Sequence, residues 1–274
     1  MNKNTMRLYL IILATIFTVR QSTAETHVSG AVSGTWTPDN SPYIADAAIS
    51  VSQSDTLIIE PGVSVIFTGR FGLSVSGILI AEGGERDSIF FNARDHQPDA
   101  WIGIEFNGMR SGYSRLAFCS ISYGYRGIIF NGAHPSVTNS SFVYHENNAL
   151  RFEGSRARVE NCSISNINGT GIAILEQSRP TVQGCTISDC GNNGISVSEG
   201  SGPIIIGNNI RDITENGISL NDADACSLRS NMISHVDLRG VWINQSSDVI
   251  LLRNVIDACG REGCWIYRSE DITL

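Results

Sequence analysis

Three residues of the types that catalyse sugar chemistry recur at one position of a repeated pattern. Asp189, Asp212 and His235 follow one another at a constant interval, in a column that also contains Asn166 and Ala258. A pair of carboxyl groups beside an imidazole provides the groups that general acid–base catalysis on a glycosidic bond needs. The column therefore predicts a candidate catalytic site at Asp189, Asp212 and His235. Asp and Asn are also common turn residues, so an ordinary turn is the alternative interpretation.

A second column consists of acidic residues at the same interval: Glu176, Glu199 and Asp222. If successive repeats stack on one another, these carboxylates lie about 5 Å apart. Carboxylates that close repel one another, and a cation such as calcium would relieve the repulsion. The column is therefore a candidate calcium site. The alternative is a solvated turn whose side chains splay apart.

The third candidate site is aromatic and consists of Trp242, Trp265 and Tyr267. Each Trp alternates with apolar neighbours, which predicts that it points outward from a strand whose other side chains face a core. Two indoles on neighbouring repeats form a flat apolar strip with N–H edges, which suits the binding of a sugar chain. The alternative is that these rings cover an interface with further residues.

The elements that position these residues are set by an internal repeat. The pattern glycine, apolar, any residue, apolar recurs along the chain, and its first residues are Gly103, Gly127, Ala149, Gly171, Gly194, Gly217, Gly240 and Gly263. The segments between turn residues are short, alternate in polarity and are rich in β-branched residues, which is typical of strands. No repeat contains a stretch long enough for an amphipathic helix. Because the interval is nearly constant, the repeat predicts a coiled chain whose equivalent strands stack as parallel ladders.

A second repeated phrase has one polar position inside an apolar frame. That position is Cys119, Ser140, Cys162, Cys185, Asn208, Asn231 and Asn254 in successive repeats. We expect the three asparagines to form an inward amide ladder in which each side chain bonds to the next. The predicted fold class is all-β: a right-handed, single-stranded parallel β-helix of about ten coils.

The cysteines fall in the same inward columns. We expect Cys162, Cys185, Cys190, Cys259 and Cys264 to be buried free thiols, since each replaces a core residue. Cys162 and Cys185 lie on neighbouring repeats, so a disulfide between them is the alternative.

The G-I-x-I and N-x-I phrases, from about Trp101 to the end, resemble the right-handed parallel β-helix proteins of the pectin-lyase-like superfamily, especially its short-repeat secreted and periplasmic members. The segment from Leu57 to Val63 resembles the opening coils of secreted members. This resemblance implies a carbohydrate-related role, although the architecture hosts lyases, hydrolases, epimerases and binders. The Asn-Thr-Asp signature of polygalacturonase-like hydrolases and the Asp-Pro-His-Glu signature of alginate epimerases are missing.

The net charge of the chain and its N-terminal segment indicate where the protein is located and which partners it can bind. Residues 1–24 read as a secretory signal peptide, with Lys3 and Arg7 before an apolar run and small residues before Glu25. The chain has 19 basic and 27 acidic residues, and removal of this segment leaves a net charge of −11. We therefore expect an exported protein with no nucleic-acid partner, since no basic stripe remains, and with no membrane span.

We expect three further segments: a lead-in over 25–45, irregular first coils over 46–100 and regular coils over 101–274. No polar cap is visible in the last repeat, so a further C-terminal domain or a partner chain is expected there. The functional prediction is a non-catalytic module that binds a polysaccharide or a cell-surface glycan. The alternative is a polysaccharide lyase or glycoside hydrolase that acts on the outer face. Calcium is the one cofactor that the sequence suggests.

Overall fold

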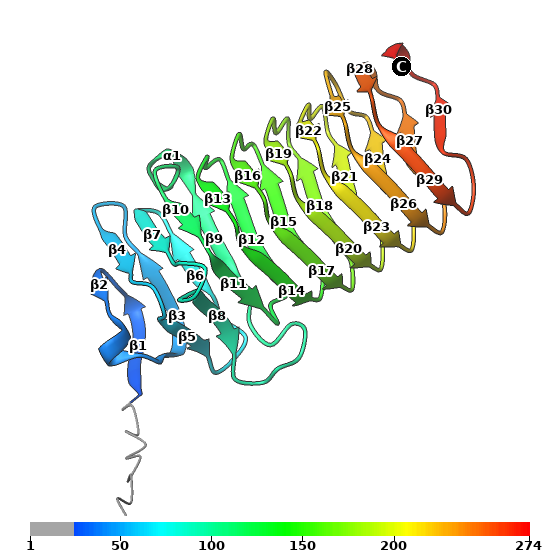
Figure 1. Cartoon of the computed structure of the whole chain (residues 1–274). Coiled ribbons are helices and arrows are strands. Elements are labelled where there is room, and N and C mark those ends of the chain that lie inside the picture. Colours follow the sequence, from blue (N-terminus) through cyan, green and yellow to red (C-terminus); the bar gives the residue numbers. More distant parts are fainter. Residues whose placement is uncertain (1–24) are drawn as a thin grey trace, which may run out of the picture.

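Short strands separated by corner residues wind the chain into a right-handed parallel β-helix (Figure 1). The computed structural model describes residues 25–274, and the predicted signal peptide, residues 1–24, lies outside the described residues. The predicted fold class is confirmed. The coils form three walls, which we number in the order in which the chain visits them after each polar ladder position.

Strands of the first wall directly follow the polar ladder positions. They are β5 (Ser64–Phe67), β8 (Ile89–Ala93), β11 (Cys119–Ser122), β14 (Ser141–His145), β17 (Ser163–Ile167), β20 (Thr186–Cys190), β23 (Asn209–Ile213), β26 (Met232–Val236) and β29 (Val255–Cys259).

The second wall contains the glycine-led phrases. Its strands are β6 (Leu73–Val75), β9 (Ile104–Asn107), β12 (Arg126–Asn131), β15 (Asn148–Glu153), β18 (Thr170–Leu175), β21 (Ile195–Ser198), β24 (Ile218–Asn221), β27 (Val241–Asn244) and β30 (Cys264–Tyr267).

The third wall is a sheet of 11 strands, one from each coil. They are β2 (Gly34–Trp36), β4 (Thr56–Ile59), β7 (Ile78–Glu82), β10 (Arg115–Ala117), β13 (Ser136–Thr138), β16 (Arg158–Glu160), β19 (Thr181–Gln183), β22 (Ile204–Ile206), β25 (Ser227–Arg229), β28 (Ser247–Leu252) and β31 (Glu270–Thr273). Within residues 25–274 the helical segments are η1 (Pro38–Asn40) and α1 (Gly108–Ser111), and no helix there is long and apolar enough to cross a bilayer.

The tube begins earlier than the sequence suggested. Residues 25–45, predicted as a lead-in, already form part of the first coil: β1 (Thr26–Ala31) pairs in parallel with β3 (Tyr43–Val51), and β2 pairs with β4. Trp36 is buried and stacks on Tyr43 with 4.4 Å between ring centroids. This aromatic pair supplies the core of a coil whose sequence lacks the repeat phrases.

Each regular coil turns three corners, and the corners share one backbone feature. At least one residue per corner adopts the left-handed conformation with φ near +55°, and the two sequence columns around Asp212 and Glu199 are two of these corner rows. Asn, Asp and Gly tolerate this conformation best, which explains part of the turn composition.

Inside the tube the predicted amide ladder is confirmed. Asn208 Nδ2 donates to Asn231 Oδ1 over 3.0 Å, and Asn231 Nδ2 donates to Asn254 Oδ1 over 2.9 Å. The repeat glycines have an equally direct cause. A Cβ on Gly194 would lie 2.6 Å from the carbonyl oxygen of Gly217 on the next coil, so only glycine permits this spacing.

The prediction for the cysteines is correct in part. All seven thiols are free, so the alternative disulfide is not formed, and Cys162, Cys185 and Cys190 are buried as predicted. Burial raises the pKa of the Cys190 thiol to about 12, and the hydrogen bond shared with Cys185 raises the pKa of Cys162. The structure differs from the prediction for Cys264, which is exposed, and for Cys259, which is half-buried, because both lie in the last coil that the structure describes.

Candidate functional site

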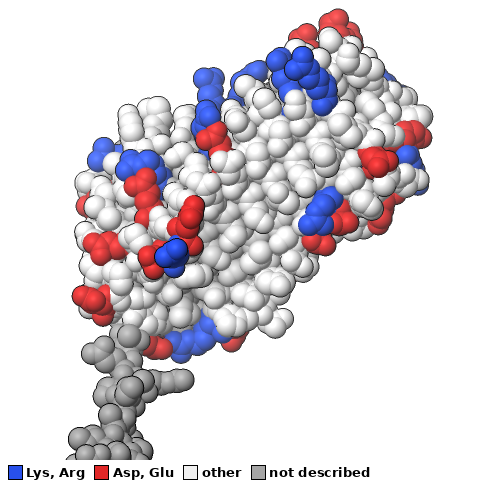
Figure 2. All heavy atoms as spheres, viewed as in Figure 1, with Lys and Arg blue, Asp and Glu red and all other residues white. Residues whose placement is uncertain are grey.

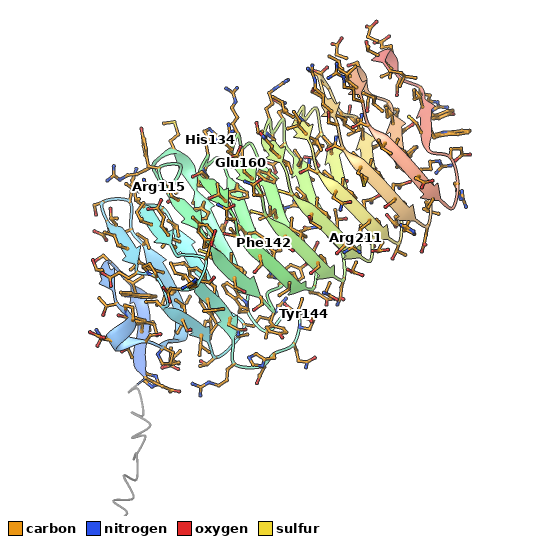
Figure 3. The ribbon with its side chains drawn as sticks, viewed as in Figure 1. Arg115, His134, Phe142, Tyr144, Glu160 and Arg211 are labelled. Carbon is orange, nitrogen blue, oxygen red and sulfur yellow. The ribbon has the colours of Figure 1, made fainter. Side chains whose placement is uncertain are left out.

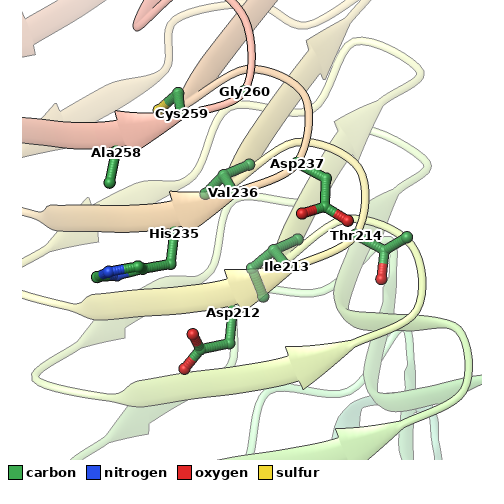
Figure 4. A pocket seen from close by; sticks show the side chains of 9 residues that line it. All are labelled: Asp212, Ile213, Thr214, His235, Val236, Asp237, Ala258, Cys259 and Gly260. Atoms are coloured by element: carbon green, nitrogen blue, oxygen red, sulfur yellow. The ribbon is translucent and has the colours of Figure 1, made fainter.

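The predicted catalytic residues line an open groove at the corner between the first and second walls. Asp212 and His235 project in one row from β23 and β26, and Thr214 and Asp237 form a second row two residues later (Figure 4). This part of the groove encloses about 690 Å³ and reaches Gly260. The structure therefore brings Asp212 and His235 together on neighbouring coils, as the column predicted.

The groove continues toward the N-terminal end of the tube. A recess of about 610 Å³ shares Asp212 and Thr214 with the first, and it is lined further on by Asp189, Asn166 and Tyr144. All three predicted catalytic residues thus face one continuous groove that crosses successive coils. We call it the corner groove. Tyr144 and Arg211 both lie along the lower edge of the tube in the view of Figure 3.

The N-terminal part of the corner groove is aromatic. The rings of Tyr123 and Tyr144 stack with 5.2 Å between centroids and an interplanar angle of 9°. His96 stacks on the other side of Tyr123 at 5.1 Å. Tyr144 remains 42% exposed, so it presents its ring to the groove.

Backbone strain distinguishes these tyrosines from their neighbours in the row. Tyr123 and Tyr144 have φ of 64° and 60°, where Asn166 and Asp189 have 55° and 53°. Asn and Asp are the residues that adopt this conformation at least cost, so their presence needs no functional reason. A bulky tyrosine does not favour this left-handed conformation. Its occurrence at two successive corner positions therefore indicates that the position uses the aromatic ring.

Polar contacts fix part of the groove wall. The guanidinium of Arg211 forms an ion pair with Asp212. Asn168 donates to the Glu146 carboxylate over 2.7 Å, and Asp189 and His235 are exposed at the groove surface. The groove thus offers carboxylates, amides and an imidazole to a polyhydroxylated ligand, with one carboxylate already neutralised by Arg211.

Sequence reasoning missed Tyr123, Tyr144 and His96. The signal for the tyrosines was present, because Tyr144 precedes Asn166 by one repeat and Tyr123 precedes Tyr144 by nearly the same interval. His96 has no repeat position, since it lies in the loop between β8 and β9, and no column could have identified it.

The predicted aromatic platform lies on a different surface, the outer side of the second wall. Trp242 pairs with Trp265 and Asn244 with Tyr267 in the register of β27 and β30, so the indoles are in line as predicted. Trp265 and Tyr267 are 40% and 47% exposed. Guanidinium groups lie over both rings: Arg239 is 5.3 Å from the centroid of Trp265, and Arg268 is 5.0 Å from that of Tyr267.

The acidic column lies at the corner between the second and third walls. Glu176, Glu199 and Asp222 are exposed, and Glu199 Oε2 accepts a hydrogen bond from the backbone N–H of Glu176 over 3.2 Å. Within the described part of the chain, no three His, Cys, Asp or Glu side chains are gathered as a metal ion would require. Calcium binding at this corner stays a prediction.

Charge is unevenly distributed over the tube. In Figure 2, Arg, Asp and Glu gather along the edges, and the broad face between them is almost uncharged. Corner residues therefore carry most of the charge in this view, and the walls carry small polar and apolar side chains.

Comparisons with known proteins agree with the fold. Residues 148–274 match the family described as "Right handed beta helix region". Comparison with curated protein sequences gives no match.

Among solved structures, the Dettilon tailspike protein is similar, with a TM-score of 0.52, 16% sequence identity and 77% of this chain covered. The chain spans 47% of that protein. The A-module of an Azotobacter vinelandii mannuronan C-5 epimerase has a TM-score of 0.46 and 12% identity, over 91% of this chain and 67% of that module. A pectate lyase has a TM-score of 0.44 and 12% identity, over 77% of this chain and 70% of the enzyme. At 16% identity the likeness to the tailspike protein shows the fold alone.

Proposed function

Since this chain is a right-handed parallel β-helix protein, we propose that it is an exported module that binds a glycan chain along the corner groove. Export is supported by the signal-peptide pattern of residues 1–24. The proposed partner is a polysaccharide or a cell-surface glycan.

The observation that carries the proposal is the exposed ring of Tyr144 at the head of a continuous polar groove. A sugar ring has apolar faces that pack on an aromatic ring and hydroxyl groups around its edge that hydrogen bond to polar side chains. The groove supplies these two kinds of contact in sequence, first the tyrosine and then Asn166, Asp189 and Thr214. Because successive coils are roughly 4.8 Å apart, these groups form a regular row along an extended ligand.

The charge of the groove supports a neutral ligand. Asp189 and Asp237 are exposed carboxylates on its wall, and the chain after residue 24 has a net charge of −11. Polyuronates carry a negative charge on each sugar and would be repelled. We therefore expect neutral glycans to bind more tightly than pectate or alginate.

The test is a binding screen over neutral and uronate-containing oligosaccharides, followed by the Tyr144→Ala variant. Loss of the ring is expected to weaken binding of the best neutral oligosaccharide about tenfold or more, since each tenfold change corresponds to about 1.4 kcal/mol. Tyr113→Ala is the matched control, because Tyr113 is 70% exposed but lies beside α1 and the third wall. Equal binding by the two variants, or binding to no neutral glycan, would overturn the proposal.

Catalysis in the same groove is the second candidate function. The observation that favours it is the placement of Asp189, Asp212 and His235 on three consecutive coils along one groove. A carboxyl group and an imidazole there could act as general acid and base in glycoside hydrolysis or in elimination. Release of new reducing ends or unsaturated products from a bound glycan, abolished in Asp189→Asn, would establish it. Stable binding without products would leave the binding function alone.

A further inference from the structure

One loop departs from the repeat and reaches across the corner groove. Residues 94–100, between β8 and β9, project beyond the edge of the tube near β14 (Figure 1), and we call them the end loop. The following residue, Trp101, is fully buried, stacks on Phe67 at 4.2 Å and donates its indole N–H to the carbonyl of Ser122 over 2.7 Å. The base of the loop is therefore held firmly in the core.

The backbone N–H of Arg94 attaches the start of the end loop to the carbonyl of Phe67 over 2.8 Å, and two further contacts attach its other end. The Arg70 guanidinium Nε donates to Asp99 Oδ1 over 2.8 Å, and the backbone N–H of Ala100 donates to the carbonyl of Tyr123 over 3.1 Å. The second contact joins the loop to the coil that follows its own. The end loop is thus held by contacts to the coil before it and to the coil after it.

The end loop covers the aromatic row up to Tyr144. His96 occupies one face of the Tyr123 ring and Tyr144 the other, so neither face of Tyr123 is free for a sugar. Pro98 reaches one coil further and lines the groove together with Tyr144 and Asn166. Tyr144 is therefore the first ring that a ligand can contact, and Pro98 and His96 stand where the next sugar would lie.

From this geometry we propose that the corner groove binds the end of a glycan chain and that the end loop is the wall against which this end rests. The inference rests on the proposed function and specifies its ligand further. A chain bound along the groove extends from Tyr144 toward Asp212 and His235, and it cannot pass Pro98 in the other direction without displacing the loop. Interior segments of a long polysaccharide are excluded by the same contact.

End recognition has a stoichiometric consequence. One chain offers at most one matching end, whatever its length, so wild-type protein should bind one molecule per chain for short and long chains alike. A groove open at both ends would instead load more protein molecules as the chain becomes longer.

The experiment measures protein molecules per chain by sedimentation velocity, with size-fractionated chains of the neutral glycan that binds best in the screen. Wild-type protein is expected to give one molecule per chain at every length, and chemical modification of both chain ends should reduce affinity at least tenfold. Replacement of residues 95–99 by a short glycine linker, which keeps Trp101, should raise the number of molecules per long chain severalfold. The milder variant His96→Ala/Pro98→Gly tests the same wall if the shortened loop fails to fold.

The outcomes separate this inference from the proposed function. Several wild-type molecules on one long chain, or full affinity for end-modified chains, would overturn end recognition and leave glycan binding intact. Binding to no glycan, or binding unaffected by Tyr144→Ala, would overturn the proposed function and this inference with it.

Discussion

The interior ladder and the corner groove follow the same coils, four residues apart, but over the last three coils only the ladder keeps the same residue. At the ladder position Asn208, Asn231 and Asn254 succeed one another unchanged. At the corner position Asp212 is followed by His235 and then by Ala258, and it is preceded by Asp189. The two rows have the same spacing and the same neighbouring strands, so spacing alone does not determine their composition.

The difference lies in what each side chain contacts. Asn231 contacts Asn208 on the coil before it and Asn254 on the coil after it, as an acceptor for the first amide and a donor to the second. A corner side chain has to satisfy one backbone angle and otherwise faces solvent. In this solenoid the interior therefore preserves the fold, and function is to be sought where the repeat changes from coil to coil.

The largest expected effect comes from breaking the ladder. Asn231→Ala removes the acceptor of the Asn208 amide and the donor to the Ile205 carbonyl, which lie 3.0 Å and 2.9 Å away. Buried polar groups without partners cost about 1–3 kcal/mol each, so we expect a loss of about 4 kcal/mol in unfolding free energy. Urea unfolding measures it.

Asn209→Ala is the matched control for the ladder variant. Asn209 directly follows the ladder residue Asn208 of the preceding coil and is partly exposed at the start of β23, so its replacement should change stability by no more than about 0.5 kcal/mol. Similar losses in the two variants would contradict the contrast between interior and surface.

The second effect concerns a buried histidine of the first wall, His145. Burial lowers the pKa of its imidazole from 6.5 to about 4, against hydrogen bonds to the backbone of Ile121 and Gly124 that raise it. The unfolded chain therefore binds a proton between pH 6.5 and pH 4 that the folded chain does not bind. Stability should fall by about 3 kcal/mol as the pH decreases through this window.

His145→Ile removes the titrating group, and it introduces the residue that occupies the same position on the next coil, Ile167. The pH dependence of the melting temperature between pH 6.5 and pH 4 should become flatter than in wild type. Ile167→Val, which weakens the same column without removing a proton site, should keep the wild-type slope. An unchanged slope in His145→Ile would show that other groups cause the acid sensitivity.

Most of the fold could be predicted from the sequence because each coil constrains the next. The glycines, the inward isoleucines and the amide ladder all recur at one common interval, and a linear sequence shows such recurrence directly. The first coil was not predicted, because its core comes from the Trp36–Tyr43 pair and not from a repeated phrase. The exposure of Cys264 was not predicted because a column position indicates burial only where the structure describes a coil on each side of the residue.

The candidate site could be predicted in part. Asp189, Asp212 and His235 share a column, and the structure places them along one groove. The contacts that delimit the groove could not be predicted, because His96 and Pro98 lie in a loop without a repeat and reach Tyr123 and Tyr144 on later coils. Contacts between a non-repeating loop and a repeating wall have no periodic signal.

The aromatic platform provides a smaller test of where glycans bind. A guanidinium group already lies over the ring of Trp265 and over the ring of Tyr267. These cation–π contacts compete with a sugar for the ring faces. We expect Trp242→Ala/Trp265→Ala to weaken binding of the best neutral oligosaccharide by no more than about threefold. A larger loss of affinity than that caused by Tyr144→Ala, measured in the same titration, would show that the main binding surface lies on the second wall.

The smallest expected effect is that of calcium on the acidic corner. The carboxylate of Glu199 already accepts the backbone N–H of Glu176, and the side chains of Glu176 and Asp222 are exposed and free to separate in solvent. A ligand that binds only the folded state stabilises it by RT ln(1 + [L]/Kd), so with weak binding millimolar calcium should shift the melting temperature by no more than about 1 °C relative to a chelator. Glu199→Gln keeps an oxygen acceptor for the N–H and removes the charge, which makes it the matched control. A rise of several degrees in wild type that disappears in Glu199→Gln would show that calcium binds at this corner.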